Sequence, residues 1–215
     1  MSQSLNAPEV TPDSEATSAL LTAVADGEAS FEELFERHRR CIRDLVRLRM
    51  DARLRSRVDL SDIVQEAEID AFRRFEDFME RQPMPFHLWL RKTARERLLM
   101  LYRRHIGASI RSVDRELPLP NASSVSLAKQ LSANVASPSQ EINDRELAAK
   151  VRRAVAALPD MDREILLMRN YEDLPYAEIA CILEIESATA RKRNGRALIR
   201  LHQLLIDDGV TESQI

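Results

Sequence analysis

Hydrophobic residues recur along most of this chain every three or four positions, the spacing that places them on one face of an α-helix. The clearest case begins at Ser30, which is followed three positions later by Glu33 in the arrangement of a capping box. The apolar stripe of this segment consists of Phe31, Leu34, Phe35, Ile42, Leu45 and Val46. The pattern therefore predicts an amphipathic helix that starts at Ser30 and buries one side.

The same spacing predicts further helices in the first half of the chain. A short one runs from Ser14 to Ala25. The next is capped by Ser61, and its inner face is expected to consist of Val64, Ala67, Ala71, Phe75 and Phe78. Two prolines make Met79–Pro85 a loop. The last helix of this half ends near Gly107, and its stripe consists of Phe86, Leu90, Ala94, Leu98 and Leu101.

Helical periodicity returns in the second half of the chain, first at Leu147, Val151, Ala154, Val155 and Leu158. A break at Pro159 precedes a short helix over Asp162–Arg169. Pro175 is well placed to open the next helix. A brief turn at Glu184-Ile185 then leads to a final helix whose inward residues are Ala190, Ala197, Leu198, Leu201 and Leu205.

Residues 108–137 are rich in Ser, Pro, Asn and Ala and nearly uncharged, which is typical of a flexible linker. They are the clearest domain boundary in the sequence. We therefore expect an all-α protein of two small helical domains, one over residues 14–107 and one over residues 138–206. Residues 1–13 are expected to form a disordered tail, and residues 207–215 a short tail at the other end.

Composition supports this fold class, because only 4 of the 215 residues are glycine while 31% are charged. The net charge of −3 excludes a uniformly basic nucleic-acid-binding protein, so any surface that binds DNA must be local.

The reactive residue types form no recognisable catalytic or metal site. Cys41 and Cys181 lie far apart and outside any CxxC or Cys/His cluster, which argues against a metal site and fits a reducing cytosol. The four histidines have no ligand spacing, and we find no phosphate-binding glycine loop and no nucleophile paired with a base. The apolar runs are too short to cross a membrane. The sequence predicts a cytoplasmic protein that is not an enzyme and has no cofactor.

The charges are sorted by segment. The stretch DLSDIVQEAEIDAF (residues 59–72) is acidic, and Asp62, Gln65, Glu66 and Asp70 fall largely outside its buried stripe. Arginines are frequent in the segments before and after it. The acidic face is either simply solvated or binds a partner, and the residues alone leave both interpretations open.

The final helix is cationic and has no acidic residue between Ser187 and Ile206. Together with the short helix before it, it has the pattern of a helix-turn-helix motif, whose second helix enters the major groove of DNA. In that geometry the residues that face base edges would be Ser187, Ala188, Arg191 and Lys192, and those near phosphates would be Arg193 and Arg196. The alternative is a solvated basic face on a terminal helix.

Two long motifs resemble a known family. DIVQEAEIDAFRRF, followed by PFHLWLRKTARERLLMLYRR, resembles the second conserved region of bacterial sigma factors, and LPDMDREILLMRNYEDLPYAEIACILEI resembles the fourth. Their order, the linker between them and the missing third region are similar to the extracytoplasmic-function (ECF) group of the sigma-70 family. The resemblance covers roughly residues 14–205.

The resemblance implies a transcription initiation factor that binds core RNA polymerase, directs it to specific promoters and assists promoter melting. In the family, the DxxQE helix binds the clamp helices of the polymerase β′ subunit, so the implied contacts are Asp62, Gln65 and Glu66. The β flap is a second implied contact on the polymerase, and an anti-sigma factor is a candidate partner.

The resemblance also implies how promoter DNA is bound. The loop from Asp77 to Pro85, with Asp77 and Arg81 among the implied contacts, corresponds to the loop that captures an extruded base of the minus-ten element. Arg91, Lys92 and Arg95 are candidates for holding the opened strand. The final helix would read the minus-thirty-five element. Phe86 and Trp89 are expected in the core rather than stacked on a base.

Four residues depart from the family pattern. Glu184 stands where the turn usually has glycine, and Glu186 replaces the usual N-cap serine. Asn194 occupies a normally apolar position, and Gly195 interrupts the helix. These departures concern base contacts more than the fold. The alternative function is a polymerase-independent helix-turn-helix regulator, which would have no use for Asp62 and Glu66.

Overall fold

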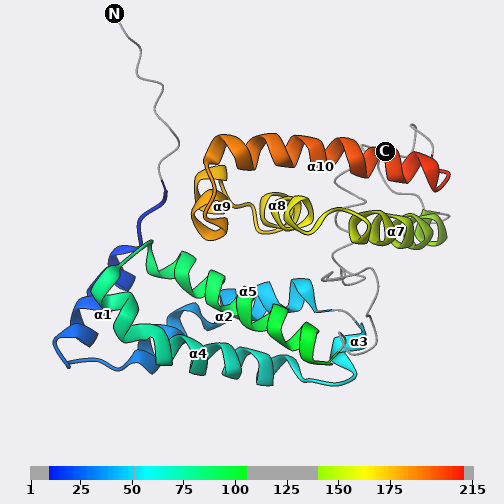
Figure 1. Ribbon diagram of the computed structural model, residues 1–215. Coiled ribbons are helices and arrows are strands. Elements are labelled where there is room, and N and C mark those ends of the chain that lie inside the picture. Colours follow the sequence, from blue (N-terminus) through cyan, green and yellow to red (C-terminus); the bar gives the residue numbers. More distant parts are fainter. Residues whose placement is uncertain (1–9, 51, 106–139, 211–215) are drawn as a thin grey trace, which may run out of the picture.

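The computed structural model describes residues 10–50, 52–105 and 140–210, and every regular element in these ranges is an α-helix. The helices form two layers in Figure 1, which we call the N-terminal lobe (residues 10–105) and the C-terminal lobe (residues 140–210). The N-terminal lobe contains α1 (Glu15–Ala25), α2 (Phe31–Arg49), α3 (Ala52–Arg55), α4 (Leu60–Arg81) and α5 (Phe86–His105). The C-terminal lobe contains α7 (Gln140–Ala156), α8 (Asp160–Asn170), α9 (Tyr176–Leu183) and α10 (Ser187–Asp207).

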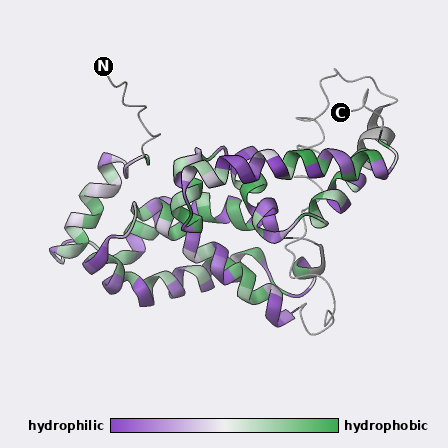
Figure 2. Cartoon of the chain, turned by 45° about the horizontal axis from the view of Figure 1, so that its top comes forward, coloured by the Kyte–Doolittle hydropathy of each residue, from purple (hydrophilic) through white to green (hydrophobic). Residues whose placement is uncertain are grey.

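The predicted all-α class is confirmed, and the helices alternate hydrophobic and hydrophilic positions along their length, as Figure 2 shows. The predicted linker, residues 108–137, lies outside the described residues. None of the helices in the described part of the chain is long and apolar enough to span a membrane.

Two of the predicted helix starts are confirmed by their caps and one is wrong. Ser14 Oγ accepts a hydrogen bond from the Thr17 amide, and Ser30 Oγ accepts one from the Glu33 amide at 3.2 Å. Helix α4 is capped by Asp59 instead of Ser61, because the Asp59 carboxylate accepts the Ser61 amide at 2.8 Å. A carboxylate suits this place, since it also faces the positive end of the helix dipole.

Helix α4 runs further than the sequence predicted, so the expected loop over Met79–Pro85 is wrong at its start. The helix continues to Arg81 and ends at Gln82, whose φ of 37° is left-handed. Proline disfavours a helical conformation only in the residue just before it, so Pro83 sets the end at Gln82 and not earlier. Asp77 and Arg81, predicted in a base-capturing loop, therefore lie on the last turns of α4. They form an ion pair at 2.8 Å.

An aromatic cluster forms the centre of the N-terminal lobe, where α2, α4 and α5 pack together. The Phe78 ring lies 4.7 Å from Trp89 and 5.4 Å from Phe86, centroid to centroid. Phe86 and Trp89 are buried, so their predicted place in the core is confirmed. Close, tilted aromatic pairs of this kind add stability beyond the burial of their area.

The C-terminal lobe has two apolar clusters. One joins Val151 and Val155 of α7 to α8 and α10. The other joins Ile165 of α8 to Ile179 of α9 and includes Leu88 of α5, so it crosses from one lobe to the other. Arg163 is buried and donates to the carbonyls of Val155 and Leu158, which ties α8 to the end of α7.

Asp13 holds the start of α5, although the sequence placed it in a disordered tail. Its carboxylate accepts from the amides of Phe86 (2.6 Å) and His87 (3.0 Å) and contacts the His87 Nδ1 at 2.8 Å. Burial alone would raise the pKa of the Asp13 carboxyl, but these hydrogen bonds outweigh it and hold that pKa below the usual value. The ordered part of the lobe therefore begins before Ser14.

We expect Asp13→Ala to destabilise the protein by about 1 kcal/mol, because the first amides of α5 lose their acceptor. The lowered pKa means that the charged carboxylate stabilises the fold above the unfolded-state value of 3.8 and stops doing so as the pH falls through the folded-state pKa. The difference between wild type and variant should therefore shrink below about pH 4. Urea unfolding followed by circular dichroism measures it. Glu28→Ala, at an exposed carboxylate between α1 and α2, is the matched control.

Candidate polymerase and promoter interface

The outer face of α4 carries the acidic and amide side chains that the sequence singled out. Asp62 and Gln65 are exposed, whereas Glu66 is held by Arg97 at 2.7 Å. Arg97 also pairs with Asp70 at 3.3 Å, so half of the expected acidic face is already partly neutralised from within the lobe. The free negative charge of this face is concentrated at the first turns of α4.

Two large apolar residues continue the same face and were not predicted. Ile69 is 42% exposed and Phe72 is 58% exposed, one and two turns beyond Gln65. The signal for them was present in the sequence, because both fall outside the buried stripe of α4. An exposed surface with charge at one end and apolar side chains at the other is typical of a protein-binding face.

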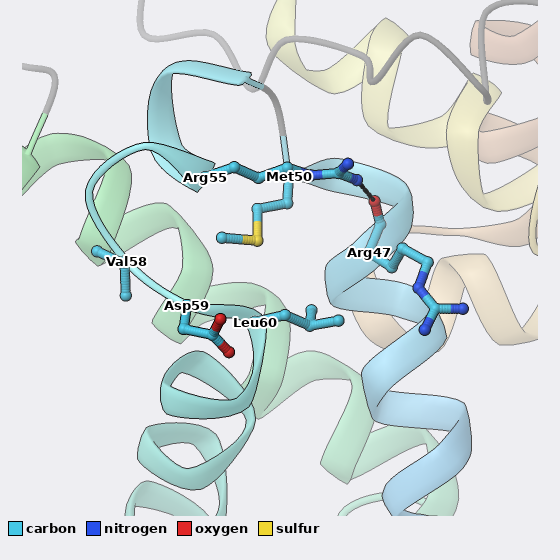
Figure 3. Close-up of a pocket in the computed structure, with 6 residues that line it drawn as sticks. All are labelled: Arg47, Met50, Arg55, Val58, Asp59 and Leu60. Carbon is cyan, nitrogen blue, oxygen red and sulfur yellow. Dashed lines mark hydrogen bonds between the residues drawn. The ribbon is translucent and has the colours of Figure 1, made fainter.

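A hollow of about 300 Å³ lies just before the first turn of α4. Figure 3 shows its lining, which combines Met50, Val58 and Leu60 with Asp59 and the cations Arg47 and Arg55. Arg55 donates to the carbonyl of Arg47 at 3.3 Å, which keeps one wall in place. The one carboxylate of the lining, Asp59, is engaged as the cap of α4. Among the described residues there is no group of His, Cys, Asp or Glu side chains arranged to hold a metal ion.

The cations predicted to hold an opened DNA strand lie together on α5, but they face carboxylates of the C-terminal lobe. Arg91 contacts Glu172 at 2.5 Å, Arg95 contacts Glu164 at 2.6 Å, and Lys92 pairs with Glu184. The three glutamates were not predicted as part of any site. Only Glu184 carried a signal, as a departure from the expected glycine.

The turn between α9 and α10 keeps the geometry of a helix-turn-helix even though its glycine is replaced. Glu184 adopts φ 56° and ψ 46°, which is the left-handed region. The Ile185 amide donates to the Ala180 carbonyl at 3.0 Å and closes the end of α9. Helix α10 then starts at Ser187 after Glu186, whose side chain makes no capping hydrogen bond.

The predicted DNA-contacting residues of α10 divide into two groups. Ala188, Arg191, Lys192 and Arg196 are exposed, and Ser187 is partly exposed at the first turn. Arg193 instead turns back toward α8, where its Nη1 lies 3.6 Å from Asp162. The buried Asp162 also pairs with Arg200. Arg193 is therefore partly neutralised, so the phosphate contact predicted for it is weakened.

Tyr176 of α9 positions the exposed part of α10. The Arg191 guanidinium lies over its ring at 5.4 Å, a cation–π contact that restricts the arginine. The Tyr176 hydroxyl accepts a hydrogen bond from Asn194 Nδ2 at 3.0 Å. Asn194 stands where the family usually has an apolar residue, and here its side chain has a specific hydrogen-bond partner in Tyr176. No pattern in the sequence indicated this role of Tyr176.

Models of two protein families match the chain, one in each lobe. The model described as "Sigma-70 region 2" matches residues 34–106, and the one described as "Sigma-70, region 4" matches residues 148–201. The first match contains α4 and α5, and the second contains the helix-turn-helix.

Several curated proteins are similar to the chain. The ECF RNA polymerase sigma-E factor of Escherichia coli (strain K12) is 31% identical over 143 residues, which cover 65% of this chain and 70% of that protein. The protein of the same name from Salmonella typhimurium (strain LT2) is 30% identical over the same share of each chain. The RNA polymerase sigma-H factor of Pseudomonas aeruginosa is 27% identical, over 65% of this chain and 69% of that one.

Among solved structures, that of CnrH in complex with the cytosolic domain of CnrY resembles the fold, with a TM-score of 0.56 and 20% identity. The likeness covers 91% of this chain and 100% of that one. The two region matches, the order of the lobes and the curated relatives agree with the motifs from which the sequence resemblance was drawn. The chain belongs to the sigma-70 family of RNA polymerase sigma factors, in its ECF group.

Proposed function

We propose that this sigma factor, which initiates transcription with RNA polymerase and is not an enzyme, binds the core polymerase through α4 and reads promoter DNA through α5 and α10. The observation that carries the proposal is the separation of charge over the surface. The exposed acids of α4 lie in one lobe, and the exposed cations of α10 lie in the other. Each set suits a partner of opposite charge.

The first turns of α4 fit a basic protein surface such as the β′ clamp helices. Asp62 and Gln65 supply an acceptor and an amide, and Ile69 and Phe72 supply the apolar area that a stable interface needs at its centre. The Glu66 carboxylate either leaves Arg97 and pairs with a cation of the polymerase, or stays paired with Arg97 at the edge of the interface. The β flap is the partner that we assign to the C-terminal lobe.

The exposed side of α10 fits the major groove of the minus-thirty-five element. Arg191 and Lys192 are placed on its second turn, where side chains of such motifs reach base edges. Arg196 lies about one turn further along and is suited to a phosphate. We place this activity in the cytoplasm, where the polymerase works.

An anti-sigma factor is a further candidate partner. The solved CnrH structure, whose fold this chain resembles, is a complex with the cytosolic domain of CnrY. For the present chain the exposed apolar residues of α4 offer a surface on which such a protein could compete with the polymerase.

A run-off assay with purified core polymerase tests the proposed function directly. We expect the chain to produce promoter-selective transcripts from a genomic library that core polymerase alone does not produce. Failure to yield any such transcript, with the chain folded and mixed with an active core, would refute the proposal.

Asp62→Lys should weaken binding to core polymerase by about tenfold or more, because it places a cation against a basic partner. Fluorescence anisotropy of the labelled chain titrated with core measures the change. Glu32→Lys makes the same charge reversal at an exposed position of α2 and should leave the affinity unchanged. If the chain were a polymerase-independent regulator, Asp62→Lys and Glu32→Lys would have the same affinity for core polymerase.

Arg191→Ala should reduce holoenzyme activity by about tenfold at promoters that depend on the minus-thirty-five element, since a base contact is lost. Arg193→Ala should have a smaller effect, because that guanidinium already pairs with Asp162. The measurement is transcription from matched promoters with intact and scrambled minus-thirty-five sequences. His202→Ala, exposed further along α10, serves as the control. Equal losses on both promoters would argue against a role in base reading.

A further inference from the structure

The contact between the two lobes contains a row of charged side chains beside its apolar cluster. Helix α5 contributes Arg91, Lys92 and Arg95, and the C-terminal lobe meets them with three glutamates. The glutamates come from three separate places: Glu164 from α8, Glu172 from the loop after α8, and Glu184 from the end of α9. Three carboxylates from different places in the C-terminal lobe thus face one row of cations on α5.

Arg49 lies behind this row and is fully enclosed. Its side chain is 0% exposed, contacts Glu172, and lies 3.7 Å from Glu164. Burial alone would lower the pKa of Arg49, but attraction to Glu172 and Glu164 outweighs burial and raises it. Burial would likewise raise the pKa of Glu164, yet Arg49 and Arg95 hold it below its usual value. Arg49 and Glu164 are therefore both charged in the closed arrangement.

This charged contact is not optimised for stability. The Nε and Nη1 atoms of Arg49 are buried and have no hydrogen-bond acceptor among the described residues. Buried ions lose their hydration, and attraction between them often does no more than offset that loss. The apolar part of the contact centres on Leu88, which packs into the cluster of α8 and α9, with Val10 and Met84 partly buried against the same cluster. A contact between lobes that contains so many charged groups is suited to opening.

The glutamates pair with the cations that the proposed function assigns to a nucleic acid backbone. A phosphate oxygen binds a guanidinium or ammonium group at the same distance and in the same directions as a carboxylate oxygen. Arg91, Lys92 and Arg95 have side chains that are only 17–18% exposed while the lobes are in contact. A strand can reach these cations only after the C-terminal lobe has moved away.

We propose that the carboxylates of Glu164, Glu172 and Glu184 act as an internal substitute for a phosphate backbone, so that the free chain keeps the cationic face of α5 closed to DNA. Binding to the polymerase then separates the lobes and uncovers the face. This inference rests on the proposed function, in which Arg91, Lys92 and Arg95 hold the opened promoter strand.

The inference also explains the residue that stands in place of the turn glycine. Glu184 accepts a left-handed backbone, which a glycine would adopt with less strain. In return its carboxylate pairs with Lys92, and that contact lowers the pKa of Glu184. A carboxylate in this turn reaches α5 of the other lobe, which glycine could not do.

The apparent affinity of the free chain for a strand is reduced by the fraction of molecules that are open. Removing the charge of Glu184 should therefore tighten binding without adding any contact to DNA. Glu184→Gln affects an exposed side chain and leaves the buried core untouched. Glu186→Gln, two positions on in the same turn and also exposed, is the matched control because Glu186 has no part in the contact between the lobes.

The experiment uses the full chain without polymerase and two measurements. Small-angle X-ray scattering reports the separation of the lobes, and anisotropy of fluorescein-labelled oligothymidylate reports binding of a single strand. We expect Glu184→Gln to bind the oligonucleotide about threefold more tightly than wild type. The double variant with Glu172→Gln should bind about tenfold more tightly and have a larger radius of gyration. Glu186→Gln should match wild type in both measurements.

A charge exchange makes the test independent of DNA binding. Lys92→Glu alone should enlarge the radius of gyration, and adding Glu184→Lys should restore the compact value. Wild-type affinity in both Glu184→Gln and the folded double variant would overturn the inference, as would wild-type dimensions in Lys92→Glu.

The proposed function has its own control. Arg91→Ala placed in the double variant should weaken oligonucleotide binding, because the uncovered face loses a cation. If it does not, the proposed role of α5 in holding DNA is wrong. The scattering data on the charge exchange would still report whether the carboxylates hold the lobes together.

Discussion

The side chain of Arg49 leaves the end of α2 and is enclosed where the two lobes meet, against Glu172 and near Glu164. A fully buried cation cannot remain without anionic partners, so its position requires the C-terminal lobe to present carboxylates at this place. The same two glutamates then draw in Arg91 and Arg95 of α5. The relative placement of α5 and the helix-turn-helix thus involves one group of charges in addition to the apolar packing around Leu88.

Charge is sorted in a similar way inside the C-terminal lobe. Asp162 is buried beneath α10 and pairs with Arg193 and Arg200, which leaves Arg191 and Arg196 directed outward. The Tyr176 ring further restricts Arg191. A recognition helix with many arginines would otherwise bind any duplex strongly and without selectivity. Neutralising some of them from within the lobe would reduce this general attraction and leave exposed the side chains that we propose for base edges.

The sequence predicted most of the fold because its information is local. The stripe from Phe31 to Val46, the helix start at Ser14 and the cap at Ser30 are each set by residues close in the sequence, and all three are confirmed. The end of α4 was predicted too early. A proline disfavours the helical conformation of the residue just before it and does not end a helix several residues upstream. The place of Asp62 on an exposed turn followed from periodicity. The pairing of Arg91 with Glu172 did not, because it joins residues 81 positions apart that no local pattern relates.

Substitutions on the two sides of the charged contact between the lobes are expected to have different effects. If α5 holds promoter DNA as proposed, substitutions of Arg91, Lys92 and Arg95 would alter both the contact between the lobes and the binding of DNA. The glutamates have no proposed contact with DNA, and their replacement changes only how readily the lobes part. Evolution, or protein engineering, could therefore change how readily the lobes separate by altering Glu184 alone. The choice of promoters would stay the same.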